Sequence, residues 1–228
     1  MPQPLLLGHR GARFYAPENT LAAFDLALAH GCDGFELDVR MSADLHPIIV
    51  HDPHLEDVVI ADFVAEKIFA IQNTIPPMWQ VFERYAATAY LNVELKVTGL
   101  EGRIAELLET YPPTKGFMVS SFLPEAIRAM HTLAPNVPMG YICRRKDLLK
   151  HWRLLPITHV VLHHSLITPE IVGEVRAEKK QIFVWTVNKR QNIEAMAAHG
   201  VDGIISDDTR LLCDVFGVAP RGRAVPAS

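Results

Sequence analysis

The chain has 228 residues, of which 49% are hydrophobic and 21% are charged, a composition typical of one globular fold in water. Its 22 basic and 26 acidic residues give a formal net charge of −4. This balance disfavours general binding of nucleic acids, because duplex binding depends on excess lysine and arginine. The apolar run at residues 5–7 is far shorter than the roughly 20 residues that cross a bilayer, so no membrane span is expected.

Short runs rich in strand-forming residues alternate with longer amphipathic stretches along most of the chain. Helices are predicted between the runs: residues 20–30 place apolar side chains on one stripe, and Thr168 and Asn188 are predicted to cap later helices. The strands are predicted at residues 5–9, 34–39, 47–51, 90–96, 117–122, 139–143, 159–163, 181–187 and 203–206.

This alternation predicts an α/β fold with parallel strands. No Gly-x-Gly-x-x-Gly follows the first strand, which disfavours a dinucleotide-binding sheet. We therefore predict a single-domain (β/α)8 TIM barrel over residues 1–217, followed by a flexible tail at residues 218–228. Nine strands are predicted for eight places, and residues 40–46 are too few for a helical crossover. Either the helix between the second and third strands is missing, leaving a loop or hairpin, or one strand lies outside the barrel.

Polar residues mark the ends of the first four predicted strands. The carboxyl ends of parallel barrel strands open on one mouth, where active sites are built. Side chains two residues apart on a strand point to the same face, so Glu36 joins Asp38 and Glu94 joins Lys96. The residues concerned are His9, Arg10, Glu36, Asp38, His51, Asp52, Glu94 and Lys96.

Three carboxylates at one mouth raise each other's pKa unless a cation neutralises them. Oxygen ligands without cysteine suit one hard divalent cation, Mg²⁺ or Ca²⁺. Two of the 11 histidines, His9 and His51, can divide the roles of general acid and general base. Arg10 and Lys96 supply positive charge for an anionic group. Each residue alone is an ordinary strand end, but together they indicate phosphoryl transfer or phosphodiester cleavage.

The same residues lie in segments that resemble the glycerophosphodiester phosphodiesterase family, of the cytoplasmic bacterial type. His-Arg-Gly at 9–11 with Pro-Glu-Asn-Thr at 17–20, and Glu-x-Asp-Val at 36–39 with His-Asp at 51–52, are specific in combination. The resemblance covers segments 8–12, 16–24, 31–39, 47–52, 92–96, 120–122, 185–188 and 200–207.

The resemblance implies metal-dependent hydrolysis of glycerophosphodiesters, small-molecule substrates, to sn-glycerol 3-phosphate and an alcohol. It also implies that the glycerol 2-hydroxyl attacks phosphorus, giving a cyclic phosphate that water opens. The implied roles are metal binding by Glu36, Asp38 and Glu94, acid–base catalysis by His9 and His51, phosphate binding by Arg10 and Lys96, and a substrate wall of Phe122 and Trp185.

The chain departs from the family pattern after the third predicted strand. Residues 53–74 contain neither the Arg-Thr pair nor the glycine-rich insertion that the family has here. In the family this insertion roofs the site, so its shortening leaves the metal chemistry in place but the choice of alcohol open. Two alternatives to the main hypothesis are a phosphodiesterase for lysophospholipids or another phospho-alcohol, and a non-catalytic barrel that binds a phosphorylated ligand.

Several polar residues have a structural interpretation. Glu18 and Asn19 precede an apolar run and are predicted to cap or brace the first helix rather than contact a ligand. Asp52 orients His51 or holds the loop. One of His163 and His164 is expected to face inward, since they are adjacent on a strand. The three cysteines, Cys32, Cys143 and Cys213, have no metal-like spacing and suggest a reducing, cytoplasmic environment.

Overall fold

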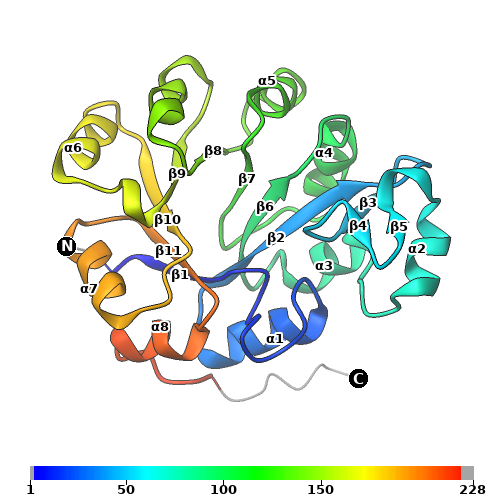
Figure 1. The fold of residues 1–228 in the computed structure, drawn as a ribbon, viewed down its shortest axis with the longest axis horizontal. Helices are drawn as coiled ribbons and strands as arrows, with labels where there is room; N and C mark the ends of the chain where they lie inside the picture. Colours follow the sequence, from blue (N-terminus) through cyan, green and yellow to red (C-terminus); the bar gives the residue numbers. More distant parts are fainter. Residues whose placement is uncertain (1–2, 222–228) are drawn as a thin grey trace.

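The fold is a closed barrel of eight parallel strands, seen nearly end-on in Figure 1. The computed structural model describes residues 3–221. Strand β1 pairs with β2 on one side and with β11 on the other, which closes the ring. In ring order the strands are β1 (Leu5–Gly8), β2 (Gly34–Met41), β6 (Tyr90–Leu95), β7 (Phe117–Ser121), β8 (Met139–Cys143), β9 (His159–His163), β10 (Gln181–Trp185) and β11 (Gly203–Ser206). The TIM barrel predicted from the sequence is confirmed.

Helices surround the barrel on its outside (Figure 1). They follow the strands as the alternation predicted, except that the crossover from β8 to β9 is a 3₁₀ helix, η2 (Lys146–Leu154). Shorter 3₁₀ turns are η1 (Ile60–Asp62) and η3 (His164–Leu166). The α-helices are α1 (Leu21–His30), α2 (Ala65–Ile71), α3 (Met78–Tyr85), α4 (Glu101–Thr110), α5 (Pro124–Leu133), α6 (Pro169–Ala177), α7 (Arg190–Ala198) and α8 (Thr209–Val215).

The extra strand among the nine predicted, at residues 47–51, lies outside the barrel. Strand β3 (Pro47–Ile49) pairs antiparallel with the end of β2, with Val39 opposite Ile49. As expected, no helix separates these two strands, because the connection is a tight turn. The predicted insertion at residues 53–74 forms a small hairpin of β4 (His54–Leu55) and β5 (Val58–Val59), then η1 and α2. Helices α2 and α3 complete the crossover to β6.

Two apolar layers hold the barrel. The outer layer fills the space between strands and helices, where Phe24 of α1 stacks on Phe35 of β2 with ring centroids 4.2 Å apart. Each such fully buried aromatic side chain contributes about 2 kcal/mol through its removal from water. The inner layer takes one residue from each of seven strands: Leu7, Tyr90, Met118, Ile142, Val161, Phe183 and Ile205. A side chain at Gly203 would collide with the Phe183 ring, so glycine there lets Phe183 fill the barrel.

His159 belongs to this interior, although the sequence predicted it at the surface or in a loop. Its side chain is buried, its Nδ1 lies 2.7 Å from Thr158 Oγ1, and its ring meets the edge of Phe183. Burial lowers its pKa to about 4. The prediction was wrong because alternation from the inward Val161 also turns His159 inward, and a neutral imidazole can occupy that place.

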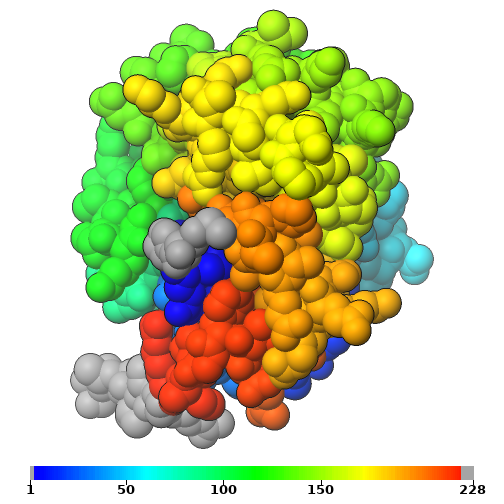
Figure 2. All heavy atoms as spheres, turned by 90° about the vertical axis from the view of Figure 1, so that its left-hand side faces the viewer, coloured from blue at the N-terminus to red at the C-terminus, as the bar shows by residue number. Residues whose placement is uncertain are grey.

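The two ends of the described chain meet on one side of the molecule. Figure 2 shows the blue N-terminal residues beside the red and orange residues near the C-terminus. Strands β1 and β11 pair over Leu5–Gly8 and Gly203–Ser206. Of the predicted tail, residues 222–228 lie outside the described residues, whereas the backbone N–H of Val218 donates to Cys213 O and its side chain packs against the core.

Candidate active site

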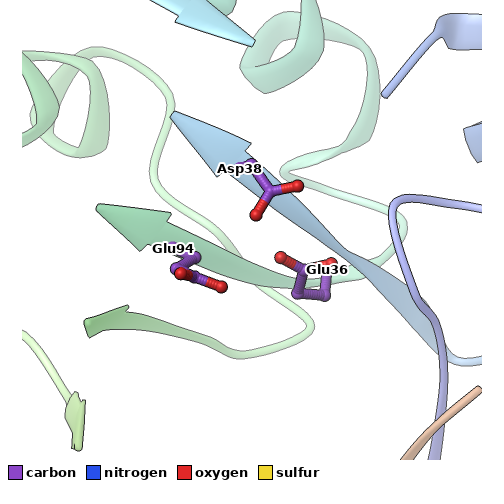
Figure 3. Close-up of side chains that lie close together, drawn as sticks. All are labelled: Glu36, Asp38 and Glu94. Atoms are coloured by element: carbon purple, nitrogen blue, oxygen red, sulfur yellow. The ribbon is translucent and has the colours of Figure 1, made fainter. Parts of the chain in front are cut away.

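Three buried carboxylates converge at the mouth of the barrel. Glu36 and Asp38 extend from β2 and Glu94 from β6, and they point toward one another in Figure 3. The strands are adjacent, with Asp38 opposite Glu94 in the register. Each residue offers one oxygen that lies within 4.8 Å of the other two, and the three are exposed by only 3%, 1% and 7%. The three carboxylates that the sequence predicted as metal ligands therefore lie together at the barrel mouth.

The three carboxylates differ in their electrostatics. Burial, followed by the charges of Asp38 and Glu94, raises the pKa of Glu36 well above its ordinary value. Burial and the charge of Asp38 raise the pKa of Glu94 to about 7. Burial would also raise the pKa of Asp38, but Lys96 and Arg10 outweigh it and the net shift is downward. The cluster thus holds more negative charge than its surroundings stabilise.

The donor set fits a hard divalent cation. Within residues 3–221, the buried Oε1 atom of Glu36 has no hydrogen-bond partner. An unpartnered buried carboxylate oxygen is costly, and a cation placed among three carboxylates would remove that cost. Oxygen-only ligation is the chemistry of Mg²⁺, Ca²⁺ and Mn²⁺ rather than of a thiolate-selective metal.

Two cations lie directly against the carboxylates. Arg10 Nε is 3.1 Å from Asp38 Oδ2, and Lys96 Nζ is 3.0 Å from Asp38 Oδ1 and 2.6 Å from Glu94 Oε1. The left-handed backbone of Arg10, with φ of 54°, turns its N–H onto Glu36 Oε2 at 2.9 Å. The sequence-predicted phosphate contacts are therefore at the same mouth as the carboxylates.

His9 follows β1 and is oriented by a residue at the far end of the chain. Its Nδ1 lies 2.7 Å from Asp207 Oδ1, and its Nε2 lies 4.0 Å from Glu36 Oε2. Because a carboxylate only accepts, Nδ1 carries the proton and Nε2 is left to face the carboxylate cluster. Asn188 holds Asp207 in turn, donating to Oδ2 at 2.6 Å and accepting from the backbone N–H at 2.9 Å.

His51 has the same arrangement with a local partner. Its Nδ1 lies 2.7 Å from Asp52 Oδ1, which leaves Nε2 available on the other side of the ring. The backbone carbonyl of His51 accepts from Arg40 Nε at 2.7 Å. Burial lowers the pKa of His51, so the neutral imidazole dominates at neutral pH.

A cavity of about 290 Å³ joins these groups. Phe122 and Trp185 lie in its wall, with ring centroids 5.6 Å apart at 84°. No residue of the 53–74 segment is among those that line this cavity in the described chain. The lining residues are His9, Arg10, Glu36, His51, Asn92, Glu94, Lys96, Phe122, Ile142, Arg144, Val161, Trp185 and Ile205.

Three residues that were predicted to cap or brace helices contact charged groups of the mouth instead: Glu18, Asn19 and Asn188. Asn19 adopts a left-handed backbone and its Nδ2 donates to Asp38 Oδ2 at 3.0 Å, while Thr20 caps α1. Glu18 accepts from Arg10 at 2.8 Å. Lys189, not Asn188, occupies the cap position of α7. These cap predictions were wrong because a polar residue before a helix can equally be directed toward the barrel mouth, which local sequence does not distinguish.

Other residues of the mouth were missed or left open. Asp207 and Arg144 were not predicted, although alternation from the inward Ile205 and Ile142 points to both. Of the histidine pair, His163 packs edge-on against Trp185 with centroids 5.6 Å apart, and its Nδ1 pairs with Ser165 Oγ at 2.8 Å.

The closed parallel barrel, with carboxylates, histidines and cations around one small cavity, defines a barrel hydrolase of phosphate esters. Residues 9–211 match the model of the glycerophosphoryl diester phosphodiesterase family. The chain belongs to this family and is a phosphoric diester hydrolase. Within residues 3–221, no helix is long and apolar enough to cross a membrane.

Relatives extend along nearly the whole chain. A glycerophosphodiester phosphodiesterase of Caldanaerobacter subterraneus is 30% identical, covering 92% of this chain and 97% of the relative. One from Bacillus altitudinis is 28% identical, with 89% and 94% covered. Among solved structures, an Oleispira antarctica phosphodiesterase in complex with the product sn-glycerol-3-phosphate superimposes with a TM-score of 0.83 at 25% identity, covering 94% of this chain and 97% of that one.

Proposed function

We propose that the chain hydrolyses glycerophosphodiesters to sn-glycerol 3-phosphate and an alcohol, using one divalent cation and the pair His9 and His51. The observation that carries the proposal is the tautomer imposed on both rings. Each Nδ1 is held by a carboxylate at 2.7 Å, so each Nε2 is free for proton transfer. The Oleispira antarctica complex with sn-glycerol-3-phosphate supports the product assignment.

Glu36, Asp38 and Glu94 would hold the cation, which we propose to be Mg²⁺ or Ca²⁺. When bound, it supplies Lewis-acid stabilisation of negative charge on the phosphate oxygens. Arg10 and Lys96, already within 3.1 Å of Asp38, would exchange part of that contact for the phosphate. Arginine can hold two phosphate oxygens at once, whereas lysine acts as a point charge.

The reaction proposed for the two histidines has two steps. One histidine takes the proton of the glycerol 2-hydroxyl on its unprotonated Nε2 as that oxygen bonds to phosphorus. The other, which enters the step as imidazolium, gives its Nε2 proton to the alkoxide as the bond from that oxygen to phosphorus breaks. Water then opens the cyclic phosphate with the two roles exchanged, and the product is the glycerol monophosphate. Asp207 and Asp52 keep the rings oriented through both steps, because each accepts from an Nδ1–H.

The test is a metal-depleted assay. The purified chain is treated with chelator and dialysed, and Mg²⁺, Ca²⁺ or Mn²⁺ is returned before glycerophosphocholine, glycerophosphoethanolamine and glycerophosphoglycerol are supplied. Coupled detection of glycerol 3-phosphate should report turnover only with metal. Full turnover in excess chelator contradicts metal dependence. Binding of glycerol 3-phosphate without turnover of any diester favours the non-catalytic barrel.

A second candidate is cleavage of lysophospholipids or another phospho-alcohol ester. It is supported by the 53–74 segment, which contributes no residue to the lining of the cavity among the described residues. A mouth that this segment does not line would admit, beside Phe122 and Trp185, a substrate larger than a free glycerophosphodiester. Faster release of choline from lysophosphatidylcholine than from glycerophosphocholine would favour this candidate, and the reverse order would exclude it.

Placement in the cytoplasm is the corresponding proposal for the environment. It is supported by the three cysteines, Cys32, Cys143 and Cys213, which are all buried free thiols. A reducing compartment preserves thiols in this state.

A further inference from the structure

Arg144 extends the inward face of β8 to the mouth of the barrel. Gly140 and Ile142 precede it at two-residue intervals, and Ile142 belongs to the cluster inside the barrel. Ile142 and Arg144 both line the cavity that contains His9 and His51. Both Arg144 and its neighbour Arg145 are exposed, but Arg145 does not line the cavity and pairs instead with Asp147 at 2.6 Å.

Arg144 lies across this cavity from His9 and Arg10. In the closed ring, β8 is four places from β1 in either direction. His9 and Arg10 follow β1 and so lie across the ring from Arg144, whereas the carboxylates come from β2, next to β1, and from β6, two places from β1 and two from β8. A phosphate bound at Arg10 and Lys96 therefore directs one of its two ester arms toward the half of the mouth that holds Arg144.

The guanidinium of Arg144 has no carboxylate partner among the ion pairs of residues 3–221. Arg10, by contrast, contacts Asp38 and Glu18. The positive charge of Arg144 reaches the neighbouring strand, where burial, His164 and Arg144 together lower the pKa of His163. The side of the cavity away from the carboxylates thus carries a positive charge available to a ligand.

Taken alone, the two aromatic rings in the cavity wall would favour a substrate whose alcohol carries a positive charge. Phe122 and Trp185 form an edge-to-face pair, and aromatic faces attract quaternary ammonium groups. However, Lys96 Nζ already lies 5.9 Å from the centre of the Phe122 ring, and Arg144 adds a second positive charge. Positively charged side chains at a binding site disfavour a positively charged ligand. The two positive charges near these rings, Lys96 from the β6 side and Arg144 from β8, therefore oppose choline and favour an anion.

We propose that Arg144 determines headgroup specificity by binding an anionic group, a carboxylate or a phosphate monoester, on the departing alcohol of the substrate. This inference rests on the proposed function, since it concerns the second arm of the same diester. The planar guanidinium suits both anions, because it can donate two parallel hydrogen bonds to either. The substrate class is thus a glycerophosphodiester whose alcohol carries a negative charge a few atoms from phosphorus.

The experiment compares two synthetic diesters of equal size. In one, glycerol 3-phosphate is esterified with γ-hydroxybutyrate, and in the other with γ-hydroxybutyramide, which differs only in charge. The wild type should prefer the carboxylate by about tenfold in kcat/KM, and Arg144→Gln should remove this preference. Arg144→Lys should retain part of it. A second arm replaces the carboxylate with a phosphate monoester, and its ratio to the neutral diester distinguishes the two anions.

Arg145→Gln is the matched control. It removes the same charge from the next residue, whose side chain lies outside the cavity. It should leave the preference unchanged. An unchanged preference in Arg144→Gln, or an equal loss on the charged and neutral diesters, overturns the proposal. If the metal-loaded wild type cleaves neither these diesters nor glycerophosphocholine, glycerophosphoethanolamine or glycerophosphoglycerol, the proposed function itself fails. If it cleaves one of those three but neither synthetic diester, only the proposal for Arg144 fails.

Discussion

The two halves of the barrel mouth are built on different principles. The half formed by β1, β2 and β6, which we call the charged half, is held together by ion pairs. Asp38, for example, lies within 3.1 Å of both Arg10 and Lys96. The half formed by β7 to β10, which we call the aromatic half, is lined by Phe122 and Trp185. It also contains Arg144, which has no carboxylate partner among the described residues. In the first half the ion pairs hold the groups proposed to surround the reacting phosphorus in fixed positions. In the second half the side chains are not tied to one another by ion pairs among the described residues, so substitutions there can change the preferred alcohol.

The largest expected effect is the loss of either histidine from the charged half. His9→Ala or His51→Ala should each lower kcat by roughly 10²–10⁴, because general acid–base catalysis contributes about this much. Steady-state kinetics with metal present measure the effect, and His54→Ala, an exposed histidine outside the cavity, is the control. Near wild-type turnover in either variant would show that the charged half is not the reactive half.

Glu94→Gln should separate activity from stability. The folded pKa of Glu94 is raised to about 7 from 4.5, so between these pH values the unfolded chain has lost a proton that the folded chain retains. Folding stability of the metal-free chain therefore falls as pH rises through this window, by roughly 3 kcal/mol at most. The variant should lose turnover yet flatten this slope, as measured by urea unfolding in chelator at several pH values.

Metal binding provides the control for that experiment. Saturating Mg²⁺ or Ca²⁺ should raise the melting temperature of the wild type, because a ligand of the folded state stabilises it. The same addition should have little effect on Glu94→Gln. An equal rise in both would place the metal elsewhere, and an unchanged pH slope would mean that Glu94 is not under electrostatic strain.

Asp207→Asn tests whether His9 is oriented from the last strand. The amide can offer a donor where Nδ1 requires an acceptor, so we expect kcat to fall roughly tenfold to a hundredfold with KM nearly unchanged. The pH profile of kcat should shift as well, which a purely structural role would not produce. Asn188→Ala, which removes the group that holds Asp207, should have a smaller effect of the same kind. A rise in KM with unchanged kcat contradicts the positioning role.

The aromatic half should show the smallest effects. Phe122→Leu or Trp185→Leu should change KM by a few-fold and alter the order of preference among alcohols, because loss of contact area affects binding more than proton transfer. Competition assays with two diesters measure the order directly. A large loss of kcat with no change in preference would contradict the division between the two halves.

Local patterns were enough to predict the barrel and the carboxylates, histidines and cations at its mouth, but not Asp207 or Arg144. Alternation placed Glu36 with Asp38 and Glu94 with Lys96, and the strand ends were predicted within about two residues. What local patterns could not supply were contacts made by closure of the ring. Asp207 meets His9 across 198 residues of sequence, and the inward side of β9 that buries His159 exists only in the closed barrel. The antiparallel direction of β3, by contrast, follows from its short connection to β2, which has too few residues for a parallel crossover.

The pairing of β1 with β11 makes the catalytic centre the last part of the molecule to be completed during synthesis. His9 leaves the ribosome early, but its partner Asp207 follows only 198 residues later. Until then the first strand lacks one neighbour and the proposed acid–base group lacks its orientation. Activity that depends on the contact between His9 and Asp207 therefore requires that the final βα unit has docked beside β1.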